Sequence, residues 1–186
     1  MAASPRPRPL TIFLGVLALA VLVLLVMGRP PICACGTVDL WGEVGPEQSQ
    51  MLADWYSPSH VIHGFLFYAF LRWAWPGAPG ERRFLAALVI EAVWEIAENS
   101  PPVIERYREA TMALGYSGDS VLNSASDIAM MAAGFLAARR FPTWLSVALV
   151  VVLELVPLIA IRDNLTLNII MLLSPSQAIL DWQSGS

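Results

Sequence analysis

The chain has 186 residues, of which 56% are hydrophobic and 14% are charged, whereas an ordinary soluble domain is roughly 45–50% apolar and about 25% charged. This composition excludes a typical soluble globule and a disordered chain, and it favours a membrane protein with a single integral membrane domain, residues 1–186. The 15 acidic residues outnumber the 11 basic ones, all of them arginine, so the net charge of −4 supplies no field that would attract nucleic acid.

The first apolar run extends from Leu10 to Met27 and contains no charged residue. Its length is sufficient to cross a bilayer as a helix. A secretory signal peptide is the alternative, because Arg6 and Arg8 precede the run. The apolar core exceeds the usual 7–15 residues of a signal peptide, and no A-x-A-like cleavage site follows it, so the sequence favours an uncleaved anchor.

A long polar stretch, residues 28–58, follows and contains Cys33 and Cys35, the only two cysteines. We expect this stretch to form an outer loop over the mouth of a helix bundle. A disulfide between the two cysteines is possible in an oxidising compartment, and a free thiol pair is the alternative.

Four further spans are predicted at 59–75, 83–99, 120–138 and 143–161. With the first run, at 10–27, they indicate an all-α transmembrane helical bundle of about five spans. Several of the spans contain ionisable residues, which are costly in lipid unless they face a partner or a cavity. Such spans are expected to pack together in a bundle.

The tail contains only nine apolar residues, Leu165 to Leu173, before Ser174 and Pro175. This length is too short to cross a bilayer, and we expect a short re-entrant or interfacial helix. A sixth span from Leu165 to Leu180 across Pro175 is the alternative.

Arginine placement predicts the orientation, because cytoplasmic loops are enriched in basic residues. With the N-terminus in the cytoplasm, seven arginines lie inside and four outside, and the inner loops are short. The C-terminus is then expected on the periplasmic side. The inner set is Arg6, Arg8, Arg72, Arg82, Arg83, Arg139 and Arg140, and the outer set is Arg29, Arg106, Arg108 and Arg162.

Polar residues recur at helical spacing within three of the spans, so that each set lines one stripe of its helix. The sets are His60 and His63; Glu91, Glu95 and Glu98; and Asp119, Asn123 and Asp127. Counting depth along alternating spans predicts three layers in the outer half of the bundle. The outermost layer holds His60, Glu98, Asp119 and Asp163, the next holds His63, Glu95 and Asn123, and the deepest holds Glu91, Asp127 and Glu154.

Two kinds of chemistry fit this pattern. Histidines and carboxylates from neighbouring helices are ligands for a divalent metal such as zinc or iron, although the Glu-x-x-His motif of many bundle sites is absent. Clustered carboxylates also support general acid–base chemistry, and we take His63, Glu95 and Glu98 as catalytic candidates. Interhelical polar contacts without chemistry are the alternative. The remaining expected pocket residues are His60, Asn123, Asp127, Asp163, Arg106, Arg108 and Arg162, the arginines as a clamp for an anionic lipid head group.

Five motifs in the chain resemble one bacterial family, over roughly Cys35 to Gln183. They read PSHVIHGFLFY, WEIAENSPPVIERYREAT, GDSVLNSASD, GFLAARRFP and IRDNLTLNIIMLL. The chain is similar here to uncharacterised protein family 0314, also described as domain of unknown function 2585. The resemblance implies a multi-pass protein of the bacterial inner membrane. It implies no activity, so no catalytic or binding residue is carried over from it.

The sequence therefore predicts an outward-facing intramembrane polar pocket that binds a metal or a lipid head group and is hydrolytic. A small carrier or proton-relay component, suggested by the deepest layer of acids, is one alternative. A structural or assembly subunit is the other. The lipid bilayer is the expected partner, nucleic acid is not, and the sequence indicates no particular protein partner.

Overall fold

Helices account for nearly all of the regular structure in a computed structural model that describes residues 9–112 and 115–185, and this part contains no strand. The long helices are α1 (Pro9–Val26), α2 (Ser57–Ala74), α3 (Gly80–Glu98), α5 (Val121–Arg140) and α6 (Thr143–Ile161). The short helices are α4 (Pro101–Ala110), α7 (Leu165–Leu173) and α8 (Gln177–Ser184). The predicted all-α fold class is confirmed.

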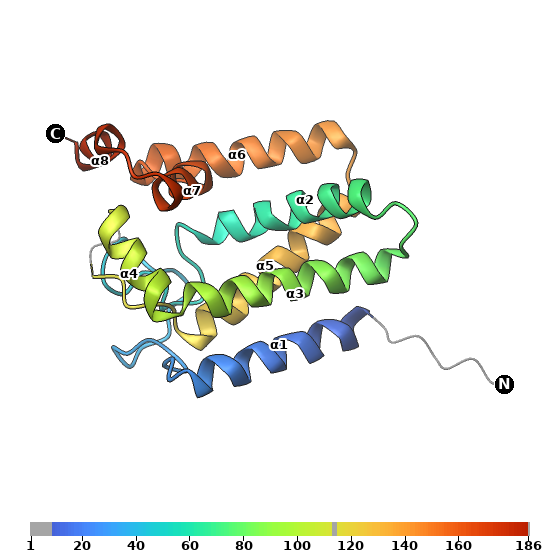
Figure 1. Ribbon diagram of the computed structural model, residues 1–186, viewed down its shortest axis with the longest axis horizontal. Helices are drawn as coiled ribbons and strands as arrows, with labels where there is room; N and C mark the ends of the chain where they lie inside the picture. The colour runs from blue at the N-terminus through green and yellow to red at the C-terminus, as the bar shows by residue number, and fades with distance from the viewer. Residues whose placement is uncertain (1–8, 113–114, 186) are drawn as a thin grey trace.

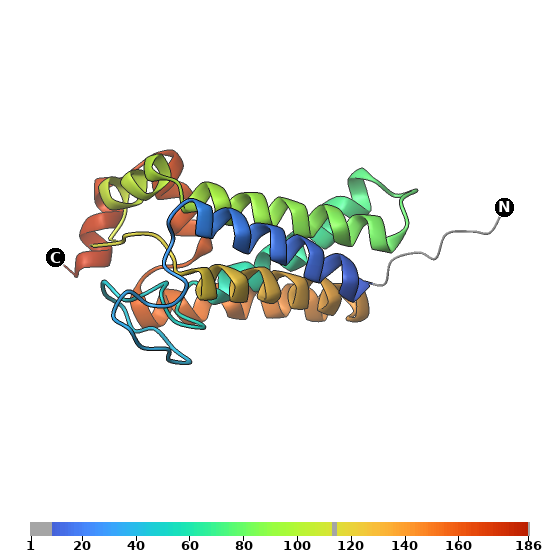
Figure 2. The same ribbon diagram turned by 90° about the horizontal axis from the view of Figure 1, so that it is seen from below.

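The long helices lie side by side along the long axis of the molecule (Figure 1). Figure 1 shows α6, α2, α3 and α1 from top to bottom, with α5 behind α2 and α3. The view from below shows α1 against α3 and α5, which are its main packing partners (Figure 2). Residues from α1, α2, α3 and α5 thus surround a common interior.

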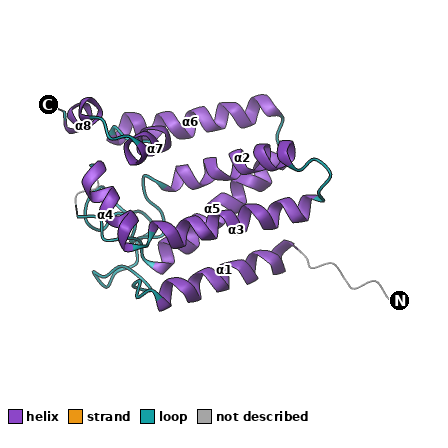
Figure 3. Ribbon diagram, viewed as in Figure 1, coloured by secondary structure: helices purple, strands orange, loops and turns teal. Residues whose placement is uncertain are grey.

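The two ends of the bundle differ in length and content. The short connections at 75–79 and 141–142 lie at the end where α1 begins (Figure 1). The opposite end holds α4, α7, α8 and the long loop 27–56, drawn in teal in Figure 3. This arrangement agrees with the predicted alternation of short and long connections. Arg6 and Arg8, which also support the orientation, lie outside the described residues.

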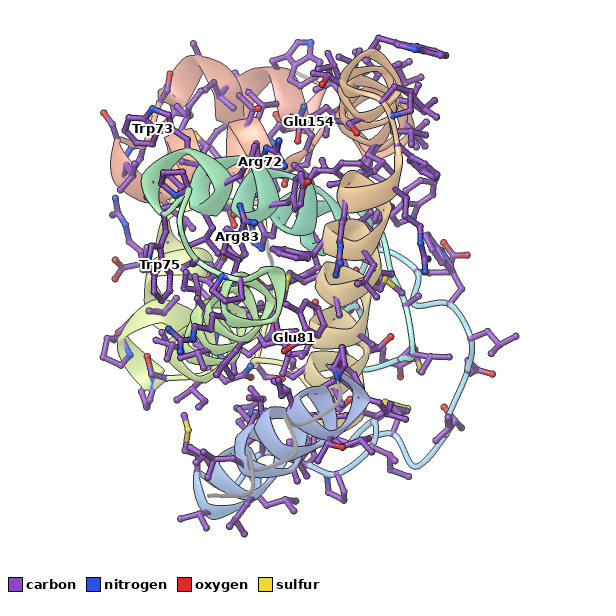
Figure 4. The ribbon with its side chains drawn as sticks, turned by 90° about the vertical axis from the view of Figure 1, so that its right-hand side faces the viewer. Arg72, Trp73, Trp75, Glu81, Arg83 and Glu154 are labelled. Carbon is purple, nitrogen blue, oxygen red and sulfur yellow. A yellow bond between two sulfur atoms is a disulfide. The ribbon has the colours of Figure 1, made fainter. Side chains whose placement is uncertain are left out.

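The end with short connections carries charged and aromatic side chains around the turn from α2 to α3. Figure 4 shows Arg72, Trp73 and Trp75 near the end of α2, with Glu81 and Arg83 at the start of α3. Trp73 is 78% exposed. An indole in this position suits a membrane–water interface, where one face of the ring is apolar and its N–H is hydrated.

Three of the long helices, α1, α5 and α6, are long and apolar enough to cross a membrane by length and composition. Helices α2 and α3 have 18 and 19 residues but are not among these candidates: α2 contains two histidines and Arg72, and α3 contains four glutamates and two arginines. The five-span count therefore stays a prediction. The tail forms α7 and α8 as two separate helices, because α7 ends at Leu173 and α8 begins only at Gln177.

Large apolar side chains fill the half of the bundle nearest the short connections. The buried members from α2, α3 and α5 are Leu71, Phe84, Leu88, Met131 and Phe135. Ala20 of α1 packs against the same cluster. This apolar core fixes α2, α3 and α5 to one another.

Helices α2 and α5 cross at two glycines. A Cβ atom on Gly64 would lie 2.2 Å from the Met131 carbonyl oxygen, and one on Gly134 would lie 2.2 Å from the Val61 carbonyl oxygen. Only glycine permits such an approach of two backbones. Since both helices run in the same direction, His60, about one turn before Gly64, and Asp127, about two turns before Gly134, also come close.

The loop between α1 and α2 is fastened to the rest of the bundle. A disulfide joins Cys33 to Cys35, which settles the choice between disulfide and free thiols. Asp54 accepts hydrogen bonds from the backbone N–H groups of Ser49, Tyr56 and Ser57. These bonds fix the approach of the chain to α2 and therefore the position of its first turns.

Candidate functional site: a buried histidine–carboxylate cluster

Five ionisable side chains from α2, α3 and α5 meet above the apolar core, and we call them the histidine–carboxylate cluster. They are His60, His63, Glu91, Glu95 and Asp127. Glu91 lies between both rings: its Oε1 is 2.7 Å from His60 Nδ1, and its Oε2 is 3.1 Å from His63 Nδ1. One carboxylate thus faces two imidazoles.

Two more carboxylates surround His60. Glu95 Oε1 lies 3.3 Å from His60 Nδ1, and Asp127 Oδ2 lies 3.7 Å from His60 Nε2. Neither oxygen of Glu95 has a hydrogen-bond partner, although this residue is 0% exposed. A buried carboxylate without a hydrogen bond is costly unless it is protonated or faces a cation.

The cluster contains two overlapping sets of ligand types for a metal. One set is His60, His63 and Glu91, and the other is His60, Glu95 and Asp127. Within each set the candidate donor atoms all lie within 4.8 Å of one another. Imidazole nitrogen and carboxylate oxygen together suit zinc or a related first-row divalent ion.

A cavity of about 830 Å³ adjoins the cluster. His60, His63 and Asp127 contribute to its polar wall, and Glu98 and Asp163 lie along the same wall. Other lining side chains, from α2, α3 and α7, are apolar. The volume falls within the roughly 300–1,000 Å³ typical of small-ligand sites.

A second polar group closes the outer end of the cavity around Asp119. Its Oδ2 accepts a hydrogen bond from Asn99 Nδ2 at 2.8 Å, and its Oδ1 accepts one from Tyr116 Oη at 2.9 Å. Burial raises the pKa of the Asp119 carboxyl to about 6, while these hydrogen bonds oppose the rise. Asp119 therefore titrates near physiological pH.

Tyr56 and Asp163 link the start of α2 to the end of α6. Tyr56 Oη donates to Asp163 Oδ2 at 2.7 Å. Burial raises the pKa of the Asp163 carboxyl and, with the negative charge of Asp163, also the pKa of the Tyr56 hydroxyl. The phenol consequently remains a hydrogen-bond donor at neutral pH.

The structure brings some of the sequence-predicted residues into the cluster and places others beside it. His60, His63, Glu95 and Asp127 meet, whereas Glu98 lines the cavity further out. Asn123 also borders the cavity, but its side chain donates to the Met51 carbonyl oxygen at 3.0 Å and holds the long loop.

The expected arginine clamp is not found at the cavity. Arg106 donates two hydrogen bonds to the Leu172 carbonyl oxygen, at 2.9 and 2.7 Å. Arg108 Nε donates to the Tyr116 carbonyl oxygen, and Arg162 donates to that of Trp182. Because these guanidinium groups satisfy the exposed carbonyls of helix ends and loops, they connect segments of the chain and do not line the cavity.

The depths of Glu91 and Asp127 were predicted incorrectly. Both were assigned to a layer two below His60, yet Glu91 is hydrogen-bonded to His60 and Asp127 Oδ2 lies 3.7 Å from His60 Nε2. Helix α3 extends outward beyond the first turn of α2, which shifts its carboxylates by about two turns relative to the predicted layers. Glu154 is also separate: its Oε2 accepts from the Thr166 backbone N–H at 3.2 Å, at the start of α7.

Comparison with known proteins gives one family. The model of the family described as protein of unknown function (DUF2585) matches residues 24–185. The chain is 57% identical over 177 residues to a UPF0314 protein of Sphingopyxis alaskensis, with 92% of each chain covered. It is 51% identical over 190 residues to the UPF0314 protein Atu8092 of Agrobacterium fabrum, with 100% of this chain and 96% of the relative covered. No solved structure gives a significant match.

Proposed function

The chain belongs to the DUF2585 family, and from this premise we propose that it is a multi-pass protein of the bacterial inner membrane whose histidine–carboxylate cluster binds a divalent metal ion. The N-terminus lies in the cytoplasm and the cluster lies in the outer half of the membrane. The metal and the adjoining cavity together form a hydrolytic site.

The distribution of polarity on α2 and α3 supports a membrane span for each. Away from the short connection, both helices turn ionisable side chains inward, as His60, Glu91 and Glu95 show, and leave large apolar side chains, such as Phe70 and Val93, exposed. A soluble helix has the opposite arrangement. These three side chains are thus kept away from the lipid, as intramembrane charges generally are.

The observation that carries the metal proposal is the environment of Glu95. Its carboxylate is fully buried and lacks a hydrogen bond, while two further carboxylates and two imidazoles surround the same space. A divalent cation would balance the buried negative charge and supply a partner for the Glu95 oxygens.

A bound metal would act as a Lewis acid and lower the pKa of a water ligand towards neutrality. In this proposal His60, Glu95 and Asp127 hold the ion, and Glu91, which lies 2.7 Å from His60 Nδ1, orients that ring. His63 lies at the cavity wall, where it can accept or donate a proton, and Glu98 offers a second carboxyl to a substrate in the cavity.

The apolar core argues against the alternative of a proton or ion pathway through the bundle. Such a path needs polar groups at successive depths. Below the cluster, α2, α3 and α5 are instead joined by fully buried apolar side chains, including Leu88, Met131 and Phe135. The polar groups therefore open towards one end of the bundle only.

A metal inventory of the purified, detergent-solubilised protein tests the proposal. We expect about one zinc, iron or manganese ion per chain, as for a single closed set of ligands. Glu91→Gln should lower the metal content at least about tenfold, because this carboxylate faces both histidines. Glu154→Gln is the matched control, since it changes another helical carboxylate outside the cluster and should leave the metal content unchanged.

Size-exclusion profiles and thermal unfolding of the variants separate loss of metal from loss of fold. A metal-free wild-type protein that also binds no added Zn²⁺ would overturn the proposal. So would a folded Glu91→Gln protein that retains the full metal content.

A further inference from the structure

The cavity changes from polar to apolar along its length. Its polar part includes the side chains of Glu98, Asp119, Asp127 and Asp163. Its apolar part is lined by Leu66, Phe67, Ile90, Trp94, Ile169 and Leu172. A purely polar metabolite would leave the apolar part unmatched, and a simple hydrocarbon would bury the carboxyl groups against an apolar surface without further hydrogen bonds. The ligand that matches both walls is an amphiphile.

The apolar rim lies on the flank of the bundle. Leu66 of α2, Ile90 of α3 and Ile169 of α7 line the cavity and yet are 50%, 40% and 45% exposed. These three helices therefore border a side opening with apolar edges. In a bilayer such an opening admits an acyl chain without first moving it into water.

The charge of the cavity selects the head group. Among the described residues that line it, five are aspartate or glutamate, two are histidine, and none is arginine. The nearby Arg106 and Arg108 donate to backbone carbonyls instead. A phosphate or free carboxylate head would find no arginine partner in this lining, whereas hydroxyl or amine groups would find acceptors.

We infer that the cavity binds a long-chain amphiphile with an uncharged or cationic head group, which enters between α2, α3 and α7 and places its head beside the carboxylates. A bound metal would neutralise the cluster, but Glu98, Asp119 and Asp163 lie outside both ligand sets and would keep the outer wall acidic. The inference depends on the cavity walls alone, so it and the metal proposal can fail separately.

A pair of photoreactive lipids tests the inference on the full-length protein in vesicles of phosphatidylcholine. The probes are a diazirine-bearing monoacylglycerol and the lysophosphatidic acid with the same chain, which differ only by the phosphate. We expect the neutral probe to label peptides around Phe67 and Trp94 at least about tenfold more than the anionic probe, since the described lining offers the phosphate no arginine partner to offset its desolvation.

Two variants should remove the label from the cavity. Leu66→Trp and Ile169→Trp enlarge side chains at the rim and should reduce labelling of the Phe67 and Trp94 peptides at least about fivefold, which corresponds to roughly 1 kcal/mol. Leu19→Trp is the matched control, because Leu19 is an exposed residue of α1 outside the cavity lining.

Equal labelling by both probes would overturn the selection for an uncharged or cationic head. Acyl-chain binding would be overturned by a different result. The cavity peptides would then be labelled no more strongly than exposed α1, and the rim variants would not change their labelling. Metal content measured on the same samples shows whether the metal site is intact, so failure of the metal proposal is distinguished from failure of this one.

Discussion

The bundle has two halves built from the same long helices. The half near the short connections is packed through apolar side chains, and the half near α4 and α7 contains the buried polar groups. In the first half, α2, α3 and α5 meet through apolar side chains and the close crossing at Gly64 and Gly134. In the second half they meet through the histidine–carboxylate cluster and diverge around a cavity of about 830 Å³. The first half supplies rigidity, and the second holds buried charge that packing alone does not stabilise.

Helix α3 contributes to both the apolar core and the histidine–carboxylate cluster. On α3, Leu88 lies in the apolar core, and Glu91, less than one turn later, faces both histidines. Neighbouring turns of a tightly packed helix hold their side chains within narrow limits. The core therefore positions the cluster, and changes in the two halves should have separable effects.

The largest effect is expected for Gly64→Ala, which breaks the apolar half. The new Cβ would lie 2.2 Å from the Met131 carbonyl oxygen, so the backbones of α2 and α5 would have to separate. The loss should exceed the ~1–3 kcal/mol typical of overpacking and abolish a folded bundle. Fluorescence-detected size exclusion measures it. Gly15→Ala, on α1 with open space at the Cβ position, should be harmless, and a well-folded Gly64→Ala protein would contradict the crossing.

Phe135→Ala should weaken the same half without removing the cluster. Phe135 is almost fully buried against Phe84 and Tyr68. Its truncation should lower the free energy of unfolding by about 3–5 kcal/mol. Metal content per folded molecule should remain that of the wild type, as measured on the monodisperse fraction. A selective loss of metal would show that the two halves are not separable.

The polar half should give a distinct pH dependence through Asp119. Its folded-state pKa of about 6 lies above the ordinary value of 3.8, so between pH 4 and 6 the folded protein binds more protons than the unfolded chain. The free energy of unfolding therefore falls as pH rises through this window, by at most roughly 3 kcal/mol.

Asp119→Asn should flatten that part of the pH profile. The substitution also alters hydrogen bonds with Asn99 and Tyr116, so the informative quantity is the slope with pH and not the absolute stability. Thermal unfolding between pH 4 and 7 measures the slope. An unchanged slope would show that Asp119 does not titrate in this range.

The smallest effect is expected for Arg106→Gln, which loosens the connection between α4 and α7. Two hydrogen bonds from the guanidinium to the Leu172 carbonyl oxygen would be lost. Because both bonds are only partly buried, the free energy of unfolding should fall by at most about 1.5–3 kcal/mol. Hydrogen exchange at the end of α7 should increase, with little change in the apolar half. Exchange that rises equally throughout the bundle would contradict a local role.

Much of the fold follows from the sequence because apolar length and arginine placement act locally. The run from Leu10 and the break after Leu173 both coincide with helix boundaries within a few residues. The candidate site was predicted less well. His60, His63 and Glu95 were identified as site residues by their helical spacing, but Glu91 was assigned to a deeper layer.

The reason is that spacing fixes which face of a helix a residue occupies and not the axial offset between helices. That offset depends on the contact of Gly64 with α5 and on how far α3 extends past the start of α2, both of which are tertiary features. The arginines were misjudged for a related reason. Their partners are backbone carbonyls of Leu172, Tyr116 and Trp182, which no side-chain pattern reveals.

The packing of α1 has a consequence for the order of assembly during synthesis. This helix emerges from the ribosome first, yet its principal partners are α3 and α5, and α5 begins only at Val121. At about 5–20 residues per second, α1 waits on the order of ten seconds for its last partner. Docking of α1 is therefore a late, non-local step, and translation has to pass Arg140 before the first helix can reach its final neighbours.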